Sequence, residues 1–298
     1  MKIRIGFGLG VRTSFNDERF LDLVDALEHL RFDSLWLSER ITGDCPDPIV
    51  ALAVAAGRTT RLKLGTSVMV LPGRNPVLVA KELATLDRLS GGRLLPAFGL
   101  GAVDPREQQA FGVQRGERAP WFDEALPLIR RLWTEDRVDH DGDRFHLEGA
   151  SVRPRPAQSP PEVWLGGIAP AELRRVGRLA DGWLPSFVDA EQAGAGKEVV
   201  ERTAAEHGRS IDAEHYGALL PYSFGPVPDE VLQLLGALRP GTDPAQLVAV
   251  GTDTLVQRIG EFVDAGFSKF VAVPLTDPVG PIDQHLDELS AAVRPLEN

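Results

Sequence analysis

Residues 62–102 read LKLGTSVMVLPGRNPVLVAKELATLDRLSGGRLLPAFGLGA, the pattern of a strand, a helix and a second strand. The first apolar run stops at a Pro-Gly pair, residues 72–73, because proline removes a backbone donor and glycine frees the backbone. The helix opens at Asn75 with proline in its first position, and residues 90–92, Ser-Gly-Gly, form a typical helix end. The second apolar run finishes at residues 99–101, Gly-Leu-Gly. Two strands joined by such a helix are expected to lie parallel.

The same alternation of strand and helix recurs along the whole chain. Strand patterns occupy residues 3–9, 34–38, 62–70, 93–99, 163–166, 182–186, 216–221 and 269–275. Helical patterns occupy residues 17–30, 48–58, 76–89, 120–133, 171–179, 192–206, 252–265 and 281–293. Eight such units in 298 residues predict a (β/α)₈ TIM barrel, with a doubly wound open sheet as the less favoured arrangement. We therefore expect an α/β fold with a single domain over residues 1–298.

Two stretches are longer than a barrel needs and predict insertion loops. The first, near residues 135–161, contains a hairpin pattern at 137–145 and then a proline-rich connection. The second, near residues 226–250, has the pattern of an extra helix. Long loops on the C-terminal face of a barrel usually cover a site, so we expect these insertions to influence substrate choice.

Composition excludes several classes of partner. The formal net charge is -11, whereas nucleic acids and membrane surfaces require a basic footprint, so we expect neither as a partner. The chain opens with Met1 directly before a strand pattern, without the profile of a signal peptide, and it has no apolar run long enough for a membrane span. The lone Cys45 cannot form an internal disulfide. These features predict a cytoplasmic protein.

Chemistry in a barrel lies where strands end, and here the strand ends are poor in catalytic polar groups. They contain no nucleophile triad, no paired carboxylates and no set of metal ligands. Asp139, Asp141 and Asp143 imitate the start of a calcium loop, but the twelfth position is Ala150 and not glutamate, so no metal site is expected. Glycines dominate the strand ends instead, which is typical of a site that holds a flat, phosphate-bearing cofactor.

Several motifs together resemble the luciferase-like monooxygenase superfamily, and within it the actinobacterial branch that uses the deazaflavin coenzyme F420. They are FDSLWLSE at residues 32–39, LGTSV at 64–68, NP at 75–76, ATLDRLSGGR at 84–93, GLG at 99–101, WLGG at 164–167 and ADGW at 180–183. The resemblance implies a barrel with insertions, usually a homodimer, that exchanges a hydride between F420 and a small organic substrate.

The resemblance also implies where the cofactor binds. The implied residues are Thr66, Ser67, Val68, Gly99, Gly101, Gly166, Gly167, Ile168, Ala169 and Trp183. The bond between Ser67 and Val68 matches a cis peptide of F420-dependent relatives, where a bulge braces the ring from behind. Residues 166–169 precede a helix and predict an anion nest for the phosphate, although Ile168 and Ala169 replace the hydroxyl residues of many relatives. Trp183 would wall the ring pocket, with core packing as the alternative.

A group of arginines near the predicted phosphate loop could meet a polyanionic cofactor tail. The group consists of Arg153, Arg155, Arg174, Arg175 and Arg178. Solvated arginines on a helix surface are the alternative interpretation of this pattern.

Glu39 and Arg40 are the candidate catalytic residues. They occupy the place where relatives often have a carboxylate followed by histidine. Arg40 cannot titrate near neutrality, so it is a poor general base and a better clamp for an anion or a carbonyl oxygen. This departure argues against oxidation of an alcohol or a sugar phosphate and is compatible with reduction of a carbonyl or an activated alkene. The alternative for Glu39 is a structural salt bridge with Arg40 or another neighbour.

We therefore predict an F420-dependent oxidoreductase. One alternative is an FMN-dependent two-component monooxygenase, which would need a separate reductase to supply its reduced flavin. The other is a non-catalytic flavin-binding barrel, which would fit the missing histidine and hydroxyl residues. An open, glycine-lined pocket argues against that second alternative, because loss of function is expected to fill a pocket with bulky side chains.

Overall fold

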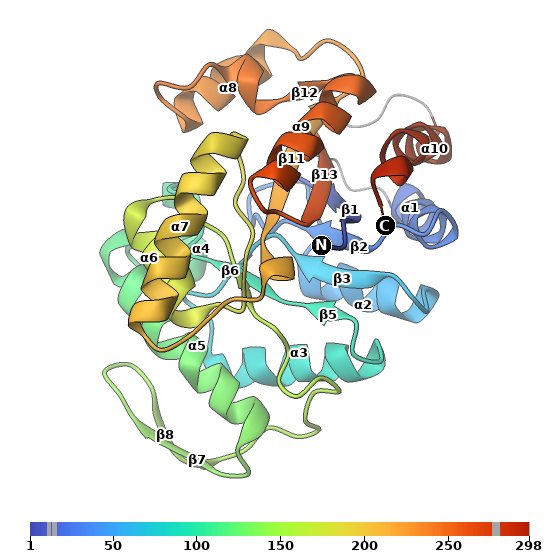
Figure 1. Cartoon of the computed structure of the whole chain (residues 1–298). Helices are drawn as coiled ribbons and strands as arrows, with labels where there is room; N and C mark the ends of the chain where they lie inside the picture. The colour runs from blue at the N-terminus through green and yellow to red at the C-terminus, as the bar shows by residue number, and fades with distance from the viewer. Residues whose placement is uncertain (11–12, 14–16, 276–280, 298) are drawn as a thin grey trace.

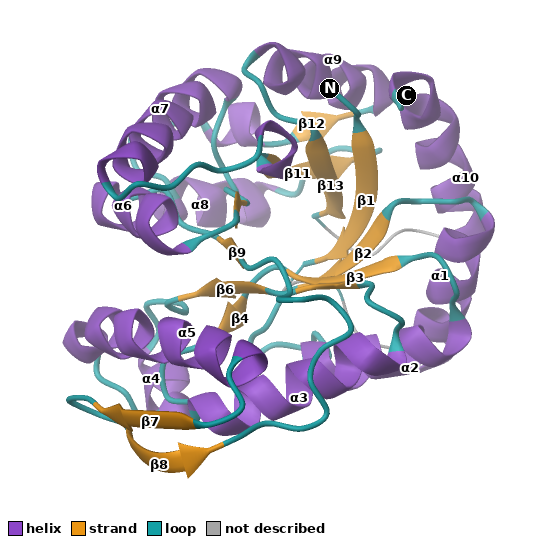
Figure 2. Cartoon of the chain, turned by 60° about the horizontal axis from the view of Figure 1, so that its bottom comes forward, coloured by secondary structure: helices purple, strands orange, loops and turns teal. Residues whose placement is uncertain are grey.

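The computed structural model describes residues 1–10, 13, 17–275 and 281–297 of the chain. Helices cover the outside of a parallel arrangement of strands (Figures 1 and 2). The first half contains β1 (Arg4–Leu9), α1 (Asp17–His29), β2 (Ser34–Leu37), α2 (Pro48–Arg58), β3 (Lys63–Thr66), β4 (Met69–Val70), α3 (Pro76–Leu89), β5 (Leu94–Leu95), β6 (Ala97–Gly99), α4 (Pro105–Phe111) and α5 (Arg118–Thr134).

The second half continues the alternation after a hairpin. It contains β7 (Val138–Asp141), β8 (His146–Ala150), β9 (Trp164–Leu165), α6 (Pro170–Leu179), β10 (Gly182–Trp183), α7 (Ala190–Glu206), β11 (Gly217–Ser223), α8 (Asp229–Leu238), β12 (Ala249–Val250), α9 (Thr252–Asp264), β13 (Lys269–Pro274) and α10 (Ile282–Val293). Each predicted strand and helix has a counterpart in the structure, so the predicted order is confirmed.

The strands form two parallel sheets and one hairpin. The seven-stranded sheet has the order β12-β11-β13-β1-β2-β3-β5, and the four-stranded sheet has the order β10-β9-β6-β4. Isolated parallel bridges link Trp183 with Tyr216 and Ser186 with Leu219, and so join the end of the four-stranded sheet to β11. These pairings confirm the α/β class with parallel strands.

Two predicted strands, 62–70 and 93–99, are each divided into two short strands, which corrects their predicted extent. The first is interrupted at residues 67–68, where the peptide between Ser67 and Val68 is cis. The second is interrupted at Pro96, which has no N–H to donate to a ladder. In both cases the first part pairs in the seven-stranded sheet and the second part in the four-stranded sheet.

The other corrections concern ends and additions. The predicted strand 182–186 is shortened to Gly182–Trp183, with a single further bridge at Ser186. Helix α4 and strand β12 were not predicted from the sequence. The hairpin expected at 137–145 is confirmed by β7 and β8, but β8 lies at His146–Ala150, beyond the predicted range. The extra helix of the second insertion is α8. In the described part of the chain, no helix is both long and apolar enough to cross a membrane.

Both ends of α3 lie where the sequence predicts them. The Asn75 side chain accepts hydrogen bonds from the backbone N–H groups of Val77 and Leu78, at 2.9 and 3.3 Å. At the other end Gly91 and Gly92 have φ angles of 70° and 83°, the left-handed conformation that glycine adopts without penalty. These local signals explain why α3 occupies the predicted residues.

A small cluster around two tryptophans, the aromatic cluster, fills the interior between the strands. Its buried members are Trp36, Trp164, Leu95, Ala97, Leu184 and Val271. The rings of Trp36 and Trp164 meet edge to face, with centroids 6.3 Å apart. Gly65 leaves room for the first ring, since a Cβ there would lie 2.2 Å from Trp36. Val68, Leu219 and Val273 pack on this cluster from above. The cluster therefore forms the floor beneath the C-terminal ends of the strands.

Candidate active site

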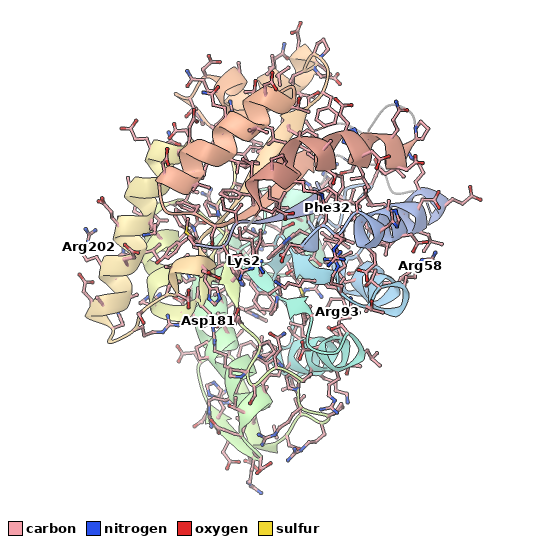
Figure 3. The ribbon with its side chains drawn as sticks, turned by 45° about the vertical axis from the view of Figure 1, so that its right-hand side comes forward. Lys2, Phe32, Arg58, Arg93, Asp181 and Arg202 are labelled. Carbon is pink, nitrogen blue, oxygen red and sulfur yellow. The ribbon has the colours of Figure 1, made fainter. Side chains whose placement is uncertain are left out.

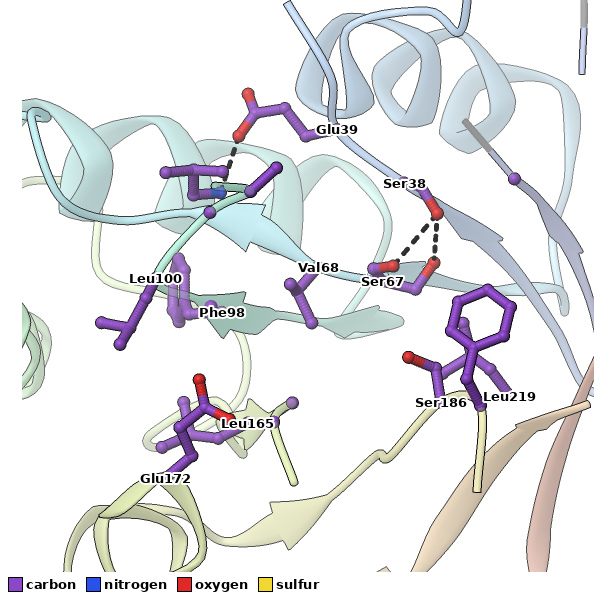
Figure 4. Close-up of a pocket in the computed structure, with 18 of the residues that line it drawn as sticks. Ser38, Glu39, Ser67, Val68, Phe98, Leu100, Leu165, Glu172, Ser186 and Leu219 are labelled. Carbon is purple, nitrogen blue, oxygen red and sulfur yellow. Dashed lines mark hydrogen bonds between the residues drawn. The ribbon is translucent and has the colours of Figure 1, made fainter. Parts of the chain in front are cut away.

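A cavity of about 340 Å³ opens at the C-terminal ends of the strands (Figure 4). Its floor is the upper side of the aromatic cluster, through Val68, Leu219 and Val273. The predicted site residues that line it are Glu39, Ser67, Val68, Gly99, Gly101, Gly166 and Gly167. Arg40, Thr66, Ile168, Ala169 and Trp183 are not part of its lining. The structure therefore brings together the glycine loops and the Ser67–Val68 segment.

Val68 projects into the middle of the cavity (Figure 4). The peptide between Ser67 and Val68 is cis, as the family resemblance implied, and the Ser38 hydroxyl donates a hydrogen bond to the Ser67 carbonyl at 3.0 Å. A Cβ at Gly99 would lie 2.5 Å from Val68 Cγ2, and one at Gly166 would lie 3.2 Å from Val68 Cγ1. Both glycines thus make room for the valine side chain.

Glu39 follows β2 and holds the backbone just beyond Val68. One carboxylate oxygen accepts a hydrogen bond from Val70 N at 2.7 Å, and the other is paired with Arg74. Arg74 also donates to the Val70 carbonyl, at 3.0 Å. The Glu39 side chain is only 2% exposed, and burial raises its pKa although the Arg74 charge opposes the shift. Its salt-bridge partner is therefore Arg74 and not Arg40.

Arg40 lies behind the cavity wall. Its guanidinium donates to Asp104 at 2.9 Å and approaches Glu107 at 3.8 Å, and its side chain is 32% exposed. Glu107 is buried, lines the cavity and accepts hydrogen bonds from both the backbone and the hydroxyl of Thr42, at 3.0 and 2.7 Å. Arg40 is engaged by Asp104 and does not line the cavity, so its catalytic role stays a prediction.

Thr66 connects the two sheets and does not face the cavity. Its hydroxyl donates to the Ala97 carbonyl at 2.6 Å and accepts from Ala97 N at 2.7 Å, and the side chain is buried. Successive side chains of a strand point to opposite sides, which explains why Ser67 lines the cavity and Thr66 does not. A cofactor contact at Thr66 stays a prediction.

The predicted anion nest already holds a carboxylate, that of Glu172. The backbone N–H groups of Ile168 and Ala169 both donate to the same Glu172 oxygen, at 3.0 Å each. Gly167 precedes them with φ of 98°, and a Cβ there would lie 2.8 Å from Glu172. A phosphate can use these two donors only if it displaces the side chain of Glu172, which itself lines the cavity.

Trp183 lies on the far side of the Gly167 backbone from the cavity. Its indole donates to the Gly167 carbonyl at 2.9 Å, and its ring lies 5.8 Å from that of Phe267. The side chain is buried, which agrees with the core-packing alternative. A direct contact with a cofactor ring stays a prediction.

The predicted arginine patch is largely occupied by acidic partners. Arg175 and Arg178 pair with Asp123 at 2.6 and 3.1 Å. Arg153 and Arg155 both pair with Asp136. These four cations are therefore already paired, and of them Arg175 lines the cavity. Arg174, the fifth member of the predicted patch, is exposed and does not line the cavity.

Sequence reasoning missed Arg118, a buried cation beside the glycine loop. The side chain is 3% exposed, and its Nη1 donates to the Ala102 carbonyl at 2.7 Å and lies 3.4 Å from where a Cβ of Gly101 would be. Its Nη2 is buried and has no hydrogen-bond partner. No sequence signal distinguishes this arginine, because it begins a helix in a charged stretch and not a strand end.

A comparison with known families identifies the family of this chain. The family model described as luciferase-like monooxygenase matches residues 5–291, nearly the whole chain. The chain belongs to this family. The match confirms the resemblance of this luciferase-like protein that was stated from the motifs.

Individual relatives of this luciferase-like protein carry two kinds of name. The F420-dependent glucose-6-phosphate dehydrogenase of Kineococcus radiotolerans is 32% identical over 189 residues, which cover 59% of this chain and 55% of that protein. The 4-hydroxyprotoasukamycin monooxygenase of Streptomyces nodosus subsp. asukaensis is 33% identical over 231 residues, covering 70% of this chain and 62% of that protein. The chain thus spans somewhat over half the length of these curated relatives.

A solved structure shares the luciferase-like fold over its full length. It is an F420-dependent secondary alcohol dehydrogenase in complex with an F420-acetone adduct, with a TM-score of 0.83, 19% sequence identity and coverage of 100% of both chains. At this identity the likeness establishes the fold alone.

Among the described residues no group of three or more His, Cys, Asp or Glu side chains is placed to hold a metal ion.

Proposed function

We propose that this protein is an F420-dependent oxidoreductase that transfers a hydride between the deazaflavin ring and a small organic substrate. The observation that carries the proposal is the cavity at the C-terminal strand ends, which is lined by glycine loops and into which the Val68 side chain projects. The name of the Kineococcus relative supports the same cofactor. A site with few reactive side chains suits an enzyme whose cofactor supplies the chemistry.

We also propose that the strands close into an eight-stranded (β/α)₈ barrel in a single domain, residues 1–298. The bridges at Trp183 and Ser186 support closure, because they join the free edge of the four-stranded sheet to β11. At the other edge β3 continues into β4 and β5 into β6, so that two strands belong to both sheets. A barrel closed in this way presents all strand ends to one cavity.

The residues present fit a flat cofactor that carries an anion. The cavity is mostly apolar in its centre, where Phe98, Val68 and Leu165 can pack against a ring (Figure 4). Arg118 offers a buried donor without a partner next to Gly101, which an anionic group would satisfy. Bound F420 would supply the hydride or accept it.

The chain's own residues would position and shield the reactants. Glu39 fixes the backbone at Val70 and so holds the Val68 side chain in the cavity. We propose Gly99, Gly101, Gly166 and Gly167 as the backbone walls around the cofactor. The remaining predicted contacts, at Thr66, Ser67, Ile168, Ala169 and Trp183, are proposals of the same kind.

We propose reduction of a carbonyl or an activated alkene as the reaction. Arg40 stands where relatives often have a histidine that exchanges a proton, and an arginine cannot do so near neutrality. Arg40 is held by Asp104 and Glu107 and would stabilise developing negative charge on the substrate after release from Asp104. This role distinguishes the proposed reaction from the sugar-phosphate oxidation in the name of the Kineococcus relative.

A second candidate is an FMN-dependent monooxygenase that receives reduced flavin from a separate reductase. The name of the Streptomyces nodosus relative favours it, since that protein is a monooxygenase at a similar level of identity. The third candidate, a non-catalytic flavin-binding barrel, is opposed by the open cavity of about 340 Å³. We further propose a cytoplasmic homodimer. Light scattering in solution tests the dimer, and a mass of one chain would refute it.

A turnover screen tests the proposed reaction. The protein is mixed with reduced F420 and a panel of carbonyl compounds and activated alkenes, and reoxidation of the cofactor is followed by absorbance. Parallel reactions use oxidised F420 with alcohols and sugar phosphates, and reduced FMN with oxygen. Substrate-dependent reoxidation of F420 is the expected result. Turnover confined to FMN and oxygen would establish the second candidate instead.

A further inference from the structure

A second hollow, of about 330 Å³, lies beside the main cavity. Its walls come from the loop before α6, from α6 and α7, and from the end of α8. Most of the lining is apolar, including Ile168, Leu173 and Val199. Among the described residues that line it, Arg239 is the only charged one, and it lies in the second insertion of the chain. Ile168 and Trp183, two of the predicted cofactor contacts, line this hollow and not the main cavity.

Arg239 carries a donor that the protein leaves unused. Its Nη2 donates to the Gln192 side chain at 3.0 Å, which fixes the guanidinium between α7 and α8. Its Nη1 is buried and has no hydrogen-bond partner, although the residue as a whole is partly exposed. A buried unpaired donor is unfavourable, and a carboxylate is the acceptor that a guanidinium binds best. The polar end of the hollow is therefore prepared for a carboxylate.

The two hollows lie on either side of two loops. Gly167 lines the main cavity and the next residue, Ile168, lines the second hollow. In the same way Phe187 lines the main cavity and Val188 lines the second hollow. An extended ligand that leaves the main cavity would have to pass over these loops to reach the second hollow. The hollow thus suits the unreactive end of a ligand whose ring lies in the cavity.

Other positive groups on this side are already engaged. Arg175 and Arg178 are paired with Asp123, and Glu172 occupies the backbone donors of Ile168 and Ala169. Of the arginine patch expected from the sequence, only Arg175 lines the main cavity, and no member lines the second hollow. Arg239, from a different part of the chain, has an unused buried donor at the second hollow, whereas the unused donor of the patch, Arg155 Nε, belongs to a residue that lines neither hollow.

We propose that the second hollow binds the carboxylate-bearing tail of the deazaflavin cofactor, with Arg239 pairing with a tail carboxylate. The proposal rests on the proposed function and extends it to a second subsite. The methylene groups of the tail lie on the apolar wall, and Gln192 keeps the guanidinium in place. FMN has no such tail, so the subsite would also discriminate between the two cofactors.

Binding titrations with two ligands test the subsite. The full-length protein is titrated with F420 and with the same deazaflavin ring on its sugar alcohol, without phosphate and tail. Arg239→Gln is the test variant. Arg202→Gln is the control, because Arg202 is an exposed arginine on the outer side of α7 (Figure 3). Thermal unfolding of each variant checks that the fold is unchanged.

The expected result is selective loss of tail binding. Arg239→Gln should weaken F420 binding by about tenfold or more, as loss of a partly buried ion pair does, and leave binding of the tail-less ring within about twofold. Arg239→Lys should recover part of the loss, since it keeps the charge but not the fork of donors. Arg202→Gln should change neither affinity.

Each contrary outcome has a definite meaning. If Arg239→Gln weakens F420 no more than Arg202→Gln, or weakens both ligands equally, the tail subsite is refuted while the proposed function stands. If the wild-type protein binds neither ligand, the proposed function fails and the subsite fails with it.

Discussion

At the N-terminal ends of the strands the charged groups are paired and the interior is filled, whereas at the C-terminal ends the interior opens into a cavity of about 340 Å³. Asp33 accepts from Lys63 at 2.9 Å and from Lys269 at 3.0 Å, and the second lysine lies 6.0 Å from the Trp164 ring. At the opposite end Arg118 and Arg239 keep unused buried donors. Trp164 Nε1 and Tyr216 Oη, near the strand starts, also lack partners, so the two ends differ in the open cavity and the arginines near it and not in unmet hydrogen bonds alone. The paired end contributes stability, and the open end has room for a ligand.

The largest expected effect concerns the paired end. Asp33→Ala should lower the free energy of unfolding by about 3–5 kcal/mol, because it leaves the buried Lys269 without its counterion. Urea unfolding measures the change. Asp25→Ala is the matched control, since Asp25 pairs with Arg58 on the surface and should contribute less than about 1 kcal/mol. Equal effects of the two substitutions would contradict the contrast between the ends.

The glycine-lined end should respond in ligand binding. In Gly99→Ala the new Cβ would lie 2.5 Å from Val68, so the valine must move into the space proposed for the ring. We expect F420 affinity to fall about 30-fold, or about 2 kcal/mol. Gly57→Ala is the control, because a Cβ there meets nothing within 4 Å. Unchanged affinity in Gly99→Ala would remove the ring from this part of the cavity.

Acid should weaken the paired end through Asp33. Burial raises the pKa of this carboxyl, but the Lys269 and Lys63 charges outweigh it and lower the pKa from 3.8 to about 2. A carboxyl with a lower pKa in the folded state stabilises the protein above its unfolded pKa. That stability, about 2 kcal/mol, should be lost as the pH falls from about 4 to about 2. Denaturation of Asp33→Asn over the same range should lack this contribution, and an identical pH dependence would contradict the assignment.

Arg40→Ala tests the rim of the open end. Turnover with the substrate found by the screen should fall about tenfold, while the F420 dissociation constant should change by less than about twofold. Arg106→Ala is the control, because Arg106 also pairs with Asp104 but is mostly exposed. A loss of cofactor affinity in Arg40→Ala, with turnover at saturation unchanged, would refute the proposed contact with substrate.

The smallest expected effect comes from Glu172, the internal occupant of the anion nest. Glu172→Gln removes a negative charge from the cavity wall and should strengthen binding of F420 and FMN about threefold. Glu198→Gln, at an exposed position of α7, is the control. Weaker binding in Glu172→Gln would indicate that the carboxylate assists the ligand.

The alternation of strands and helices could be predicted because its signals are local. The proline at Pro76 and the glycines at 91–92 act within one helix, and the structure has the predicted ends there. Pro96 has no backbone N–H, and this sequence signal could have predicted the division of strand 93–99. It could not have predicted which sheet each part joins. Which strand a residue joins depends on contacts distant in the sequence.

Site residues were predictable where they lie on the backbone of a strand end. Val68, Gly99 and Gly166 line the cavity. They could be predicted because the family motifs mark the strand ends directly. The engagement of Arg40 by Asp104 could not be predicted, since 64 residues separate them. Arg118 could not be predicted either, because it contacts the glycine loop from a separate helix, α5. Partners of long side chains follow from the packed fold and not from local spacing.

The central claim is that the open end binds F420. Titration of the wild-type protein with F420 and FMN, each oxidised and reduced, tests it most directly. Micromolar or tighter binding of F420, corresponding to about 8 kcal/mol, with much weaker binding of FMN, is the predicted result. Preferential binding of FMN would contradict the claim and assign the protein to the flavin monooxygenases, and binding of neither would leave a barrel that has lost its cofactor.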